Sequence, residues 1–443
     1  MPYIPHTSED TQAMLGLIGA SSIDELFREI PENLRVKPGA LNLPPALDEH
    51  KLMAHLTEIA AKNIDMTKVT CFLGAGVYDR YVPATVGAVI SRGEFLTSYT
   101  PYQPEASQGY LQAIYEFQSM IAEIYGMEIA NASMYDGATS MAEAAIMATG
   151  IKNRDRVTIS ETVHPHYRQV LDTYCWSMGI EVVTVPAQNG LAGDMSTVES
   201  ACVIVQYPNF FGGIEDLARA KADADKSGAM FIVVSDPVAS SLLKPPGDFG
   251  ADIVVGEGQP LGVAMGLGGP MVGLFACKKE LIRNIPGRIV GRTKELHGDK
   301  PGFVMTLRTR EQDIRREKAT SNICTNEALM ALANTVYMMA LGKNGLTQVA
   351  TSSVRNTQYA IQQLTAAGGK LKFTGKVFGE FVLSLPKNAT EVRDALLKKG
   401  ILAGLPLGSY YQGMDNDLLV AVTEVRSKDQ IDHFAQSLKE VLA

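Results

Sequence analysis

The sequence is poor in cysteine, and its few cysteines lack the spacing of a metal site or a disulfide framework. The 443 residues include five cysteines, an odd number, with no Cys-x-x-Cys pair among them. Scattered thiols of this kind predict reduced, mostly buried side chains, and neither a zinc site nor disulfide-linked loops. The five are Cys71, Cys175, Cys202, Cys277 and Cys324.

Long apolar runs and blocks of basic residues are also missing. No uninterrupted apolar segment reaches the roughly 20 residues of a membrane-spanning helix. The first residues, MPYIPHTSEDTQ, are acidic where a secretory signal would be basic. The 40 basic and 48 acidic residues give a formal net charge of −8, and no Lys/Arg run is long enough to follow a nucleic-acid backbone. We therefore expect a cytoplasmic protein that binds neither a membrane nor nucleic acid.

The middle of the chain alternates apolar, strand-like runs with amphipathic stretches. The runs include ACVIVQYP, AMFIVVSDP and ADIVVGEG, and GIEDLARAKADADKSG separates the first two. Continuous apolar strands interleaved with helices predict a parallel sheet that is covered on both faces. A hydrophobic share of 46% and a charged share of 20% suit a globular protein of two or three domains.

The two ends differ from this middle. The opening stretch reads as helices, with a capping signal at Thr7 to Asp10 and helical spacing in SSIDELFREI, before the prolines of KPGALNLPPAL. The C-terminal part combines the alternating runs VFGEFVLSLP and DLLVAVTEV with helices at TEVRDALLKKG and from Lys428 onward. We predict an N-terminal helical arm over 1–65, a large α/β domain over 66–335 and a smaller α+β domain over 336–443.

The segment SYTPYQPEASQG, residues 98–109, displays polar groups from a stiff loop. Its two prolines, Pro101 and Pro104, deny the backbone helical geometry until about Glu105. Hydroxyl and amide groups held in this way suit a ligand site. The alternative is a helix entry whose tyrosines pack as core. The polar side chains are Tyr99, Tyr102, Gln103, Glu105 and Gln108.

The segment NASMYDGATSMAEAAIMA, residues 131–148, places small and hydroxyl residues before an alanine-rich helix. Asp136, Gly137, Thr139 and Ser140 stand at its start. Backbone N–H groups at such a terminus can hold a phosphate or another anion. An ordinary capped core helix explains the pattern equally well.

A histidine pair and an aspartate follow predicted strands. HPHY comes after RVTISETV, and Asp236 ends the run FIVVSD. Open α/β sheets bind ligands at this edge. Asp236 could pair with a protonated ring nitrogen of a cofactor or simply cap the next turn. His164 and His166 have no third partner at metal-site spacing, so we expect no metal.

The segment LRTREQDIRREKATSNICTN, residues 307–326, concentrates positive charge before a polar loop. This charge could meet an anionic ligand or an acidic partner, or it could form a solvated helix face with ion pairs. The basic residues are Arg308, Arg310, Arg315, Arg316 and Lys318.

These segments resemble the glycine cleavage system P-protein, and specifically subunit 1 of its two-chain form. SYTPYQPEASQG, NASMYDGATSMAEA and LRTREQDIRREKATSNICTN are close to the family's N-terminal half, and the match runs in order over nearly the whole chain. The resemblance implies a fold type I, aspartate-aminotransferase-like transferase with pyridoxal phosphate as its cofactor. It also implies that glycine is decarboxylated and that its aminomethyl group passes to the lipoyl arm of H-protein, with the cofactor as the electron sink.

The chain departs from a fold type I enzyme at the lysine that carries the cofactor. That lysine follows the strand-end aspartate and shortly precedes a glycine-rich turn. Between Asp236 and Gly266 the only lysine is Lys244, which lies before the strand ADIVVGEG rather than after it. The expected position reads GEGQPLG, and neither Gln259 nor Pro260 offers a primary amine. We therefore expect Asp236 to mark a vestigial cofactor pocket.

The resemblance then implies one functional site per pair of unlike chains. Subunit 2 would hold pyridoxal phosphate covalently, in a heterotetramer with two copies of each subunit. This chain would line the glycine or lipoyl side with Tyr99, Thr100, Tyr102, Gln103 and Glu105, and would reach the cofactor phosphate across the interface with Thr320, Ser321 and Asn322. The alternatives are a non-catalytic scaffold that stabilises subunit 2 and docks H-protein, and an independent enzyme that uses Lys244 or Lys278.

Overall fold

The computed structural model describes residues 5–37, 39–266, 268–319 and 321–443. The chain divides into two compact units, Met1–Ile64 and Asp65–Ala443, and each is described by itself. All five cysteines are free thiols, as predicted; four are buried and Cys324 is exposed. Within the described ranges, no helix is long and apolar enough to cross a membrane, and no three His, Cys, Asp or Glu side chains gather as a metal site.

The first unit contains two helices, α1 (Ser8–Ile18) and α2 (Glu49–Ala60), and none of its described residues is buried. The predicted cap of α1 is confirmed, because the side chains of Thr7 and Asp10 each accept the other's backbone N–H. SSIDELFREI forms only a 3₁₀ turn over Asp24–Phe27 rather than the expected helix. The segment is too short to be stable as an unpacked helix, and Pro31 disfavours helical geometry at Ile30.

The second unit is built around a seven-stranded sheet in the order β2-β8-β7-β6-β5-β3-β4. Neighbouring strands from β7 to β4 are parallel, while β8 runs antiparallel to both β7 and β2. The apolar runs of the sequence form β5, β6 and β7 as predicted. The strands are β2 (Ile129–Ala130), β3 (Arg156–Ser160), β4 (Glu181–Val185), β5 (Cys202–Tyr207), β6 (Met230–Ser235), β7 (Ile253–Glu257) and β8 (Gly273–Cys277).

Helices cover both faces of this sheet, as the continuous apolar strands require. Along β5, Val203 and Val205 join one buried cluster while Ile204 joins the other. The first cluster includes residues of α5 and α8, and the second includes residues of α6 and α7. The helices are α3 (Ala84–Ile90), α4 (Gly93–Leu96), α5 (Gln108–Tyr125), α6 (Gly137–Lys152), α7 (Pro165–Ser177), α8 (Leu217–Ser227) and α9 (Pro237–Ser240).

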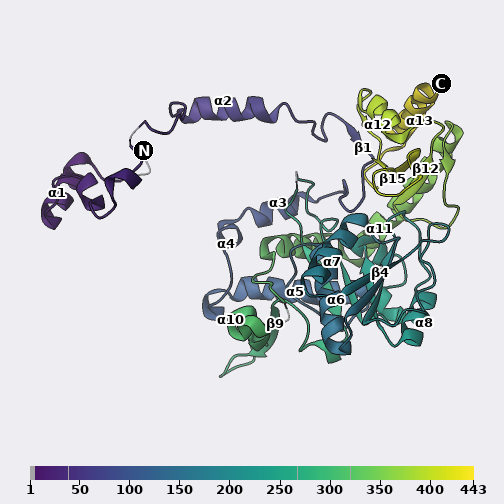
Figure 1. Cartoon of the computed structure of the whole chain (residues 1–443), viewed down its shortest axis with the longest axis horizontal. Coiled ribbons are helices and arrows are strands. Elements are labelled where there is room, and N and C mark those ends of the chain that lie inside the picture. The colour runs from purple at the N-terminus through teal and green to yellow at the C-terminus, as the bar shows by residue number, and fades with distance from the viewer. Residues whose placement is uncertain (1–4, 38, 267, 320) are drawn as a thin grey trace. The chain divides into compact units, whose positions relative to one another are not determined.

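The C-terminal part adds a four-stranded antiparallel sheet in the order β11-β12-β15-β14. It gathers with α12 and α13 beside the larger sheet (Figure 1). β1 (Thr70–Cys71) pairs in parallel with β13. The remaining elements are α11 (Ala328–Ala366), β11 (Lys370–Leu371), β12 (Glu380–Ser384), α12 (Ala389–Leu397), β13 (Ile401–Leu402), β14 (Leu405–Pro406), β15 (Asp417–Ala421) and α13 (Lys428–Leu442).

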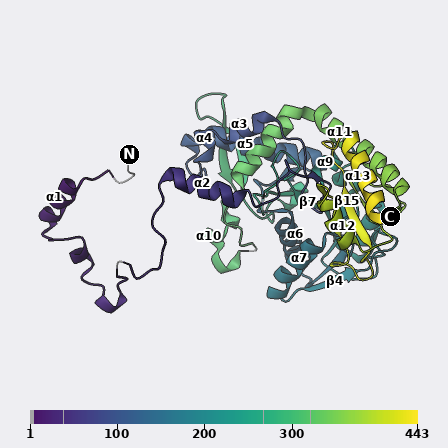
Figure 2. The ribbon, with the colours of Figure 1, turned by 90° about the horizontal axis from the view of Figure 1, so that it is seen from above.

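Helix α11 connects the two sheets, since it runs from the neighbourhood of α5 to that of α13 (Figure 2). It changes direction at Gly342, whose φ of 60° and ψ of −178° are not helical. The helix crosses residue 335, where the sequence suggests the end of the large domain. The boundary between 66–335 and 336–443 therefore stays a prediction.

A β-hairpin brings the arginine-rich segment to the surface near α5. Strands β9 (Ile289–Lys294) and β10 (Pro301–Thr306) pair antiparallel and pack against α5. The chain then forms three short helical turns, Arg308–Arg310, α10 (Gln312–Arg315) and Arg316–Lys318, before the loop that leads to α11. This arrangement sets the loop of residues 321–327 beside the proline-rich loop that precedes α5.

Candidate functional site

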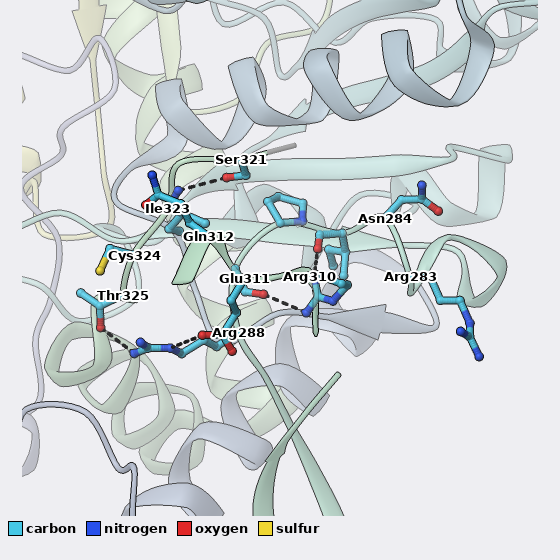
Figure 3. A pocket seen from close by; sticks show the side chains of 13 residues that line it. Arg283, Asn284, Arg288, Arg310, Glu311, Gln312, Ser321, Ile323, Cys324 and Thr325 are labelled. Atoms are coloured by element: carbon cyan, nitrogen blue, oxygen red, sulfur yellow. Dashed lines mark hydrogen bonds and ion pairs between the residues drawn. The ribbon is translucent and has the colours of Figure 1, made fainter. Parts of the chain in front are cut away.

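A buried arginine joins the two loops that the sequence singled out. Arg288 lies just before β9 and is only 5% exposed. Its guanidinium donates hydrogen bonds to the Oγ1 atoms of Thr100 (3.1 Å) and Thr325 (2.9 Å) and to the Oη atom of Tyr102 (3.3 Å). The carboxylate of Glu311 lies 3.7 Å from its Nε atom (Figure 3). We call these five residues the Arg288 cluster.

The cluster has one face open to solvent. The side chain of Tyr102 is 53% exposed, and the guanidinium of Arg288 lies 5.4 Å from its ring centroid. A hollow of about 470 Å³ opens beside them, which is within the size range of small-molecule sites. Because the Tyr102 oxygen accepts from Arg288, its own proton is free to be donated outward. The hollow is lined by Tyr102, Arg288, Glu311, Gln312, Asp313, Arg316, Ile323 and Cys324.

The structure brings together only some of the residues expected at a shared site. Thr100 and Tyr102 belong to the Arg288 cluster, and Ser321 lines a small cavity of about 30 Å³ next to it. The side chain of Asn322 is exposed. Thr320 lies outside the described residues. Tyr99, Gln103 and Glu105 are on the same loop, but their side chains are exposed and lie outside the cluster.

The arginine-rich segment is not the continuous helix face that one interpretation of the sequence suggested. Arg310 points inward and donates to the backbone oxygens of Ile285 and, at 2.9 Å, Gly287, so that it fixes the turn before Arg288. Arg308 lies within 3.7 Å of the carboxylates of Glu311 and Asp313. Inward hydrogen bonds and local ion pairs therefore account for much of this charge.

Sequence reasoning missed Arg288, Thr325 and Glu311. The only local signal is that Arg288 follows the turn residues Pro286 and Gly287 and precedes an apolar strand. Its partners Thr100 and Tyr102 stand 188 and 186 residues away along the chain. Only the folded chain brings these side chains together.

A second candidate pocket lies at the carboxyl ends of the parallel strands, where the sequence places Asp236. One carboxylate oxygen of Asp236 accepts the N–H groups of Val238 (2.7 Å) and Ala239 (3.1 Å), so this residue does cap the next turn. The other oxygen lies 3.7 Å from the guanidinium of Arg80. Arg80 is 7% exposed and also pairs with Glu424 at 2.9 Å.

The position expected for the lysine is occupied by a fully bonded glutamine. Gln259 is 2% exposed. Its Nε2 atom donates to the backbone oxygens of Tyr78 (3.0 Å) and Val263 (2.8 Å), and its Oε1 atom accepts the N–H of Tyr78 (3.0 Å). A side chain held by three backbone groups stabilises the loop and is not available to a ligand.

The histidine pair is also engaged within the chain. His164 caps α7, because its Nδ1 atom accepts the N–H of His166 (3.1 Å), while its Nε2 atom lies 2.8 Å from the backbone oxygen of Ala75. Burial lowers the pKa of His164 to about 4, so the ring is neutral at neutral pH. His164 is therefore a structural cap at the wall of the pocket.

The N-terminus of α6 is bonded to a carboxyl group that belongs to the chain itself. One oxygen of Glu257 accepts the N–H of Gly137 (2.9 Å), and the other accepts those of Gln259 and Val272 (both 3.0 Å). Burial raises the pKa of Glu257 to about 7, and the three N–H groups act in the opposite direction. Glu257 was not singled out by the sequence.

These contacts test whether the pocket suits pyridoxal phosphate. Such a cofactor needs a lysine amine, a carboxylate free to meet its ring nitrogen and an anion site for its phosphate. Gln259, the Arg80–Asp236 pair and Glu257 occupy these three places with protein groups. The remaining cavity is about 40 Å³, whereas ligand pockets of this kind begin at about 300 Å³. The residues of this chain therefore do not fit the cofactor.

Comparisons with known proteins agree over the whole length of the chain. The family model for the glycine cleavage system P-protein matches residues 1–438. The chain is 51% identical over 442 residues to a protein named probable glycine dehydrogenase (decarboxylating) subunit 1 from Anoxybacillus flavithermus, covering 98% of both chains. A protein of the same name from Halalkalibacterium halodurans is 49% identical over 441 residues, with 98% of both chains covered.

Solved structures confirm the predicted fold class. A crystal structure of glycine decarboxylase (P-protein) of the glycine cleavage system, in inhibitor-bound form, superposes with a TM-score of 0.93 at 43% identity and covers 100% of both chains. The alanine–glyoxylate aminotransferase of Nostoc shares the fold at 16% identity, with a TM-score of 0.60 over 86% of this chain and 97% of that one. The chain belongs to the glycine cleavage system P-protein family.

Proposed function

We propose that this chain is subunit 1 of a glycine dehydrogenase (decarboxylating) that acts only beside a second subunit. The pair decarboxylates glycine and transfers the aminomethyl group to the lipoyl arm of H-protein. The full-length likeness to relatives named as this subunit supports the activity. The filled pocket around Gln259 supports the assignment of covalently held pyridoxal phosphate to the second subunit. The proposed assembly is a heterotetramer with two copies of each chain. A cytoplasmic location is part of the proposal.

The Arg288 cluster carries the proposed contribution of this chain to the shared site. Burying a guanidinium costs free energy unless it is well bonded. One of the bonds of the buried Arg288 holds the hydroxyl of an exposed tyrosine beside an open hollow, where a role in stability alone would not need it. We place glycine or the lipoyl arm beside Tyr102, with Thr100 on the inner side. We assign Tyr99, Gln103 and Glu105 to the same face, and we assign to Thr320, Ser321 and Asn322 the role of reaching the cofactor phosphate of the second subunit.

In this arrangement each residue has a physical task. Arg288 holds the Tyr102 hydroxyl in one orientation, so that its proton is directed to the hollow. Arg288 and Arg316 line the hollow together with Glu311 and Asp313, so its formal charges balance, and the guanidiniums offer hydrogen-bond donors to an anionic group rather than a net positive charge. Bound pyridoxal phosphate would supply the electron sink for the decarboxylation, from the second subunit.

The experiment is a comparison of this chain alone, the second subunit alone and their mixture. Each sample receives pyridoxal phosphate, glycine and lipoylated H-protein, and glycine-dependent exchange of carbon dioxide is measured together with the cofactor absorbance. We expect exchange only in the mixture. Turnover by this chain alone would refute the proposal and favour the independent enzyme.

Variants of the mixture separate a shared site from a scaffold. We expect Tyr102→Phe and Thr320→Ala to lower exchange without changing the assembled mass. A scaffold predicts unchanged turnover once the complex has formed. Normal exchange in both variants would therefore remove these two residues from the site.

A further inference from the structure

Among the residues that the structure describes, the carboxyl group of Glu257 at the N-terminus of α6 is bonded only to backbone donors. Both carboxylate oxygens of Glu257 accept backbone N–H groups, from Gly137, Gln259 and Val272. All three partners are donors, which matches an ionised carboxylate, an acceptor-only group. The free N–H groups and the dipole of a helix start favour the same charge.

The helix start is closely packed at its first residue. A Cβ atom at Gly137 would lie 2.3 Å from the Oη atom of Tyr167 and 3.1 Å from the backbone nitrogen of Glu257, so only glycine fits there. The N-cap Asp136 turns its carboxylate to the N–H of Thr139 (2.8 Å), which leaves the N–H of Gly137 to Glu257. A phosphate would need the place that this side chain fills.

At two further places, a group of the protein itself occupies the position that a bound cofactor would need. The carboxylate of Asp236 lines the small cavity and lies 3.7 Å from the guanidinium of Arg80, and Gln259 is bonded on both sides of its amide. Glu257 and Gln259 come from one short segment at the end of β7, whereas Arg80 comes from a distant part of the chain. The space that they leave, about 40 Å³, is on the scale of one water molecule.

We propose that Glu257 is a built-in replacement for a phosphate group, and that it closes a latent binding site for phosphate monoesters at the N-terminus of α6. The carboxylate satisfies the helix start from within the chain, so a phosphate-bearing ligand gains no site here. This inference concerns the pocket of this chain and does not depend on the proposed function.

The test uses the full-length chain and three variants of one residue. Glu257→Ala empties the place at the helix start, Glu257→Ser empties it and adds a hydroxyl, and Glu257→Gln keeps the size of the side chain without its charge. Binding of inorganic phosphate and of pyridoxal phosphate is measured by titration calorimetry. Thermal unfolding in phosphate is compared with unfolding in sodium chloride of equal ionic strength.

We expect Glu257→Ala and Glu257→Ser to bind inorganic phosphate about tenfold or more tighter than the unsubstituted chain, and to gain thermal stability from phosphate. Glu257→Gln should bind none, because the amide still fills the site. If Glu257→Ala does not fold, Glu257→Ser decides the question. Folded variants that ignore phosphate, or an unsubstituted chain that binds it equally well, would overturn the proposal.

Discussion

The link between Arg288 and Tyr102 can be measured as a coupling free energy. Their hydrogen bond is 3.3 Å long and joins a buried cation to a half-exposed hydroxyl. A bond of this kind is worth about 1–2 kcal/mol, which corresponds to about 5- to 30-fold in kcat/KM if the hydroxyl acts in the transition state. Arg288→Lys keeps the charge but loses the fork that reaches three oxygens, so the hydroxyl loses its orientation.

The assay is a double-mutant cycle on the assembled enzyme, with glycine-dependent carbon dioxide exchange as the readout. We expect Tyr102→Phe and Arg288→Lys each to lower kcat/KM, and the double variant to be barely worse than either single one. Tyr99→Phe is the matched control for coupling, because Tyr99 belongs to the same proposed face but lies outside the Arg288 cluster, so its effect on kcat/KM should add to that of Arg288→Lys. Strict additivity for Tyr102, or equal coupling for Tyr99, would refute the reasoning.

Three further predictions concern stability and are checked by urea unfolding. Arg80→Gln should cost about 3–5 kcal/mol because it strands the buried Glu424, whereas Arg156→Gln, which breaks an exposed pair, should cost less than about 1 kcal/mol; equal losses would contradict this. Burial raises the pKa of Glu380 from 4.5 to about 7, so this group makes the free energy of unfolding fall by about 3 kcal/mol as pH rises from 4.5 to 7. Glu380→Gln should remove that fall, and an unchanged pH profile would exclude Glu380 as its source. Gly212→Ala should strongly destabilise the fold, because φ is +80° and the new Cβ would lie 1.9 Å from the backbone oxygen of Glu380; a normal unfolding midpoint would contradict that geometry.

The regular elements of the fold could be read from local patterns. The apolar runs of β5, β6 and β7 and the capped start of α1 occur where periodicity and capping chemistry place them. The helix expected in SSIDELFREI fails because no packing partner within its unit buries its apolar side chains, and local propensity is too weak alone. Periodicity therefore succeeds where an element is buried in the sheet or core.

The candidate site was only half accessible to sequence reasoning. The prolines around Thr100 and Tyr102 mark a stiff polar loop, and the loop of Ser321 stands out as a polar break after a basic run. Arg288 carries no such mark, since a single arginine before a strand is ordinary. Its role depends on contacts with Thr100, 188 residues away along the chain, and with Thr325, 37 residues away, and those arise only on folding.

The sequence by itself determined that no amine stands at position 259, where the resemblance places the cofactor lysine, because the identity of one residue is read directly from the chain. Only the tertiary structure decided what replaces the cofactor. Arg80 meets Asp236 from a distant loop, and Glu257 reaches the helix that begins at Gly137, 120 residues earlier. Hydrogen bonds and ion pairs of this kind act over a few ångströms in space, so the order of residues alone does not encode them in a readable pattern.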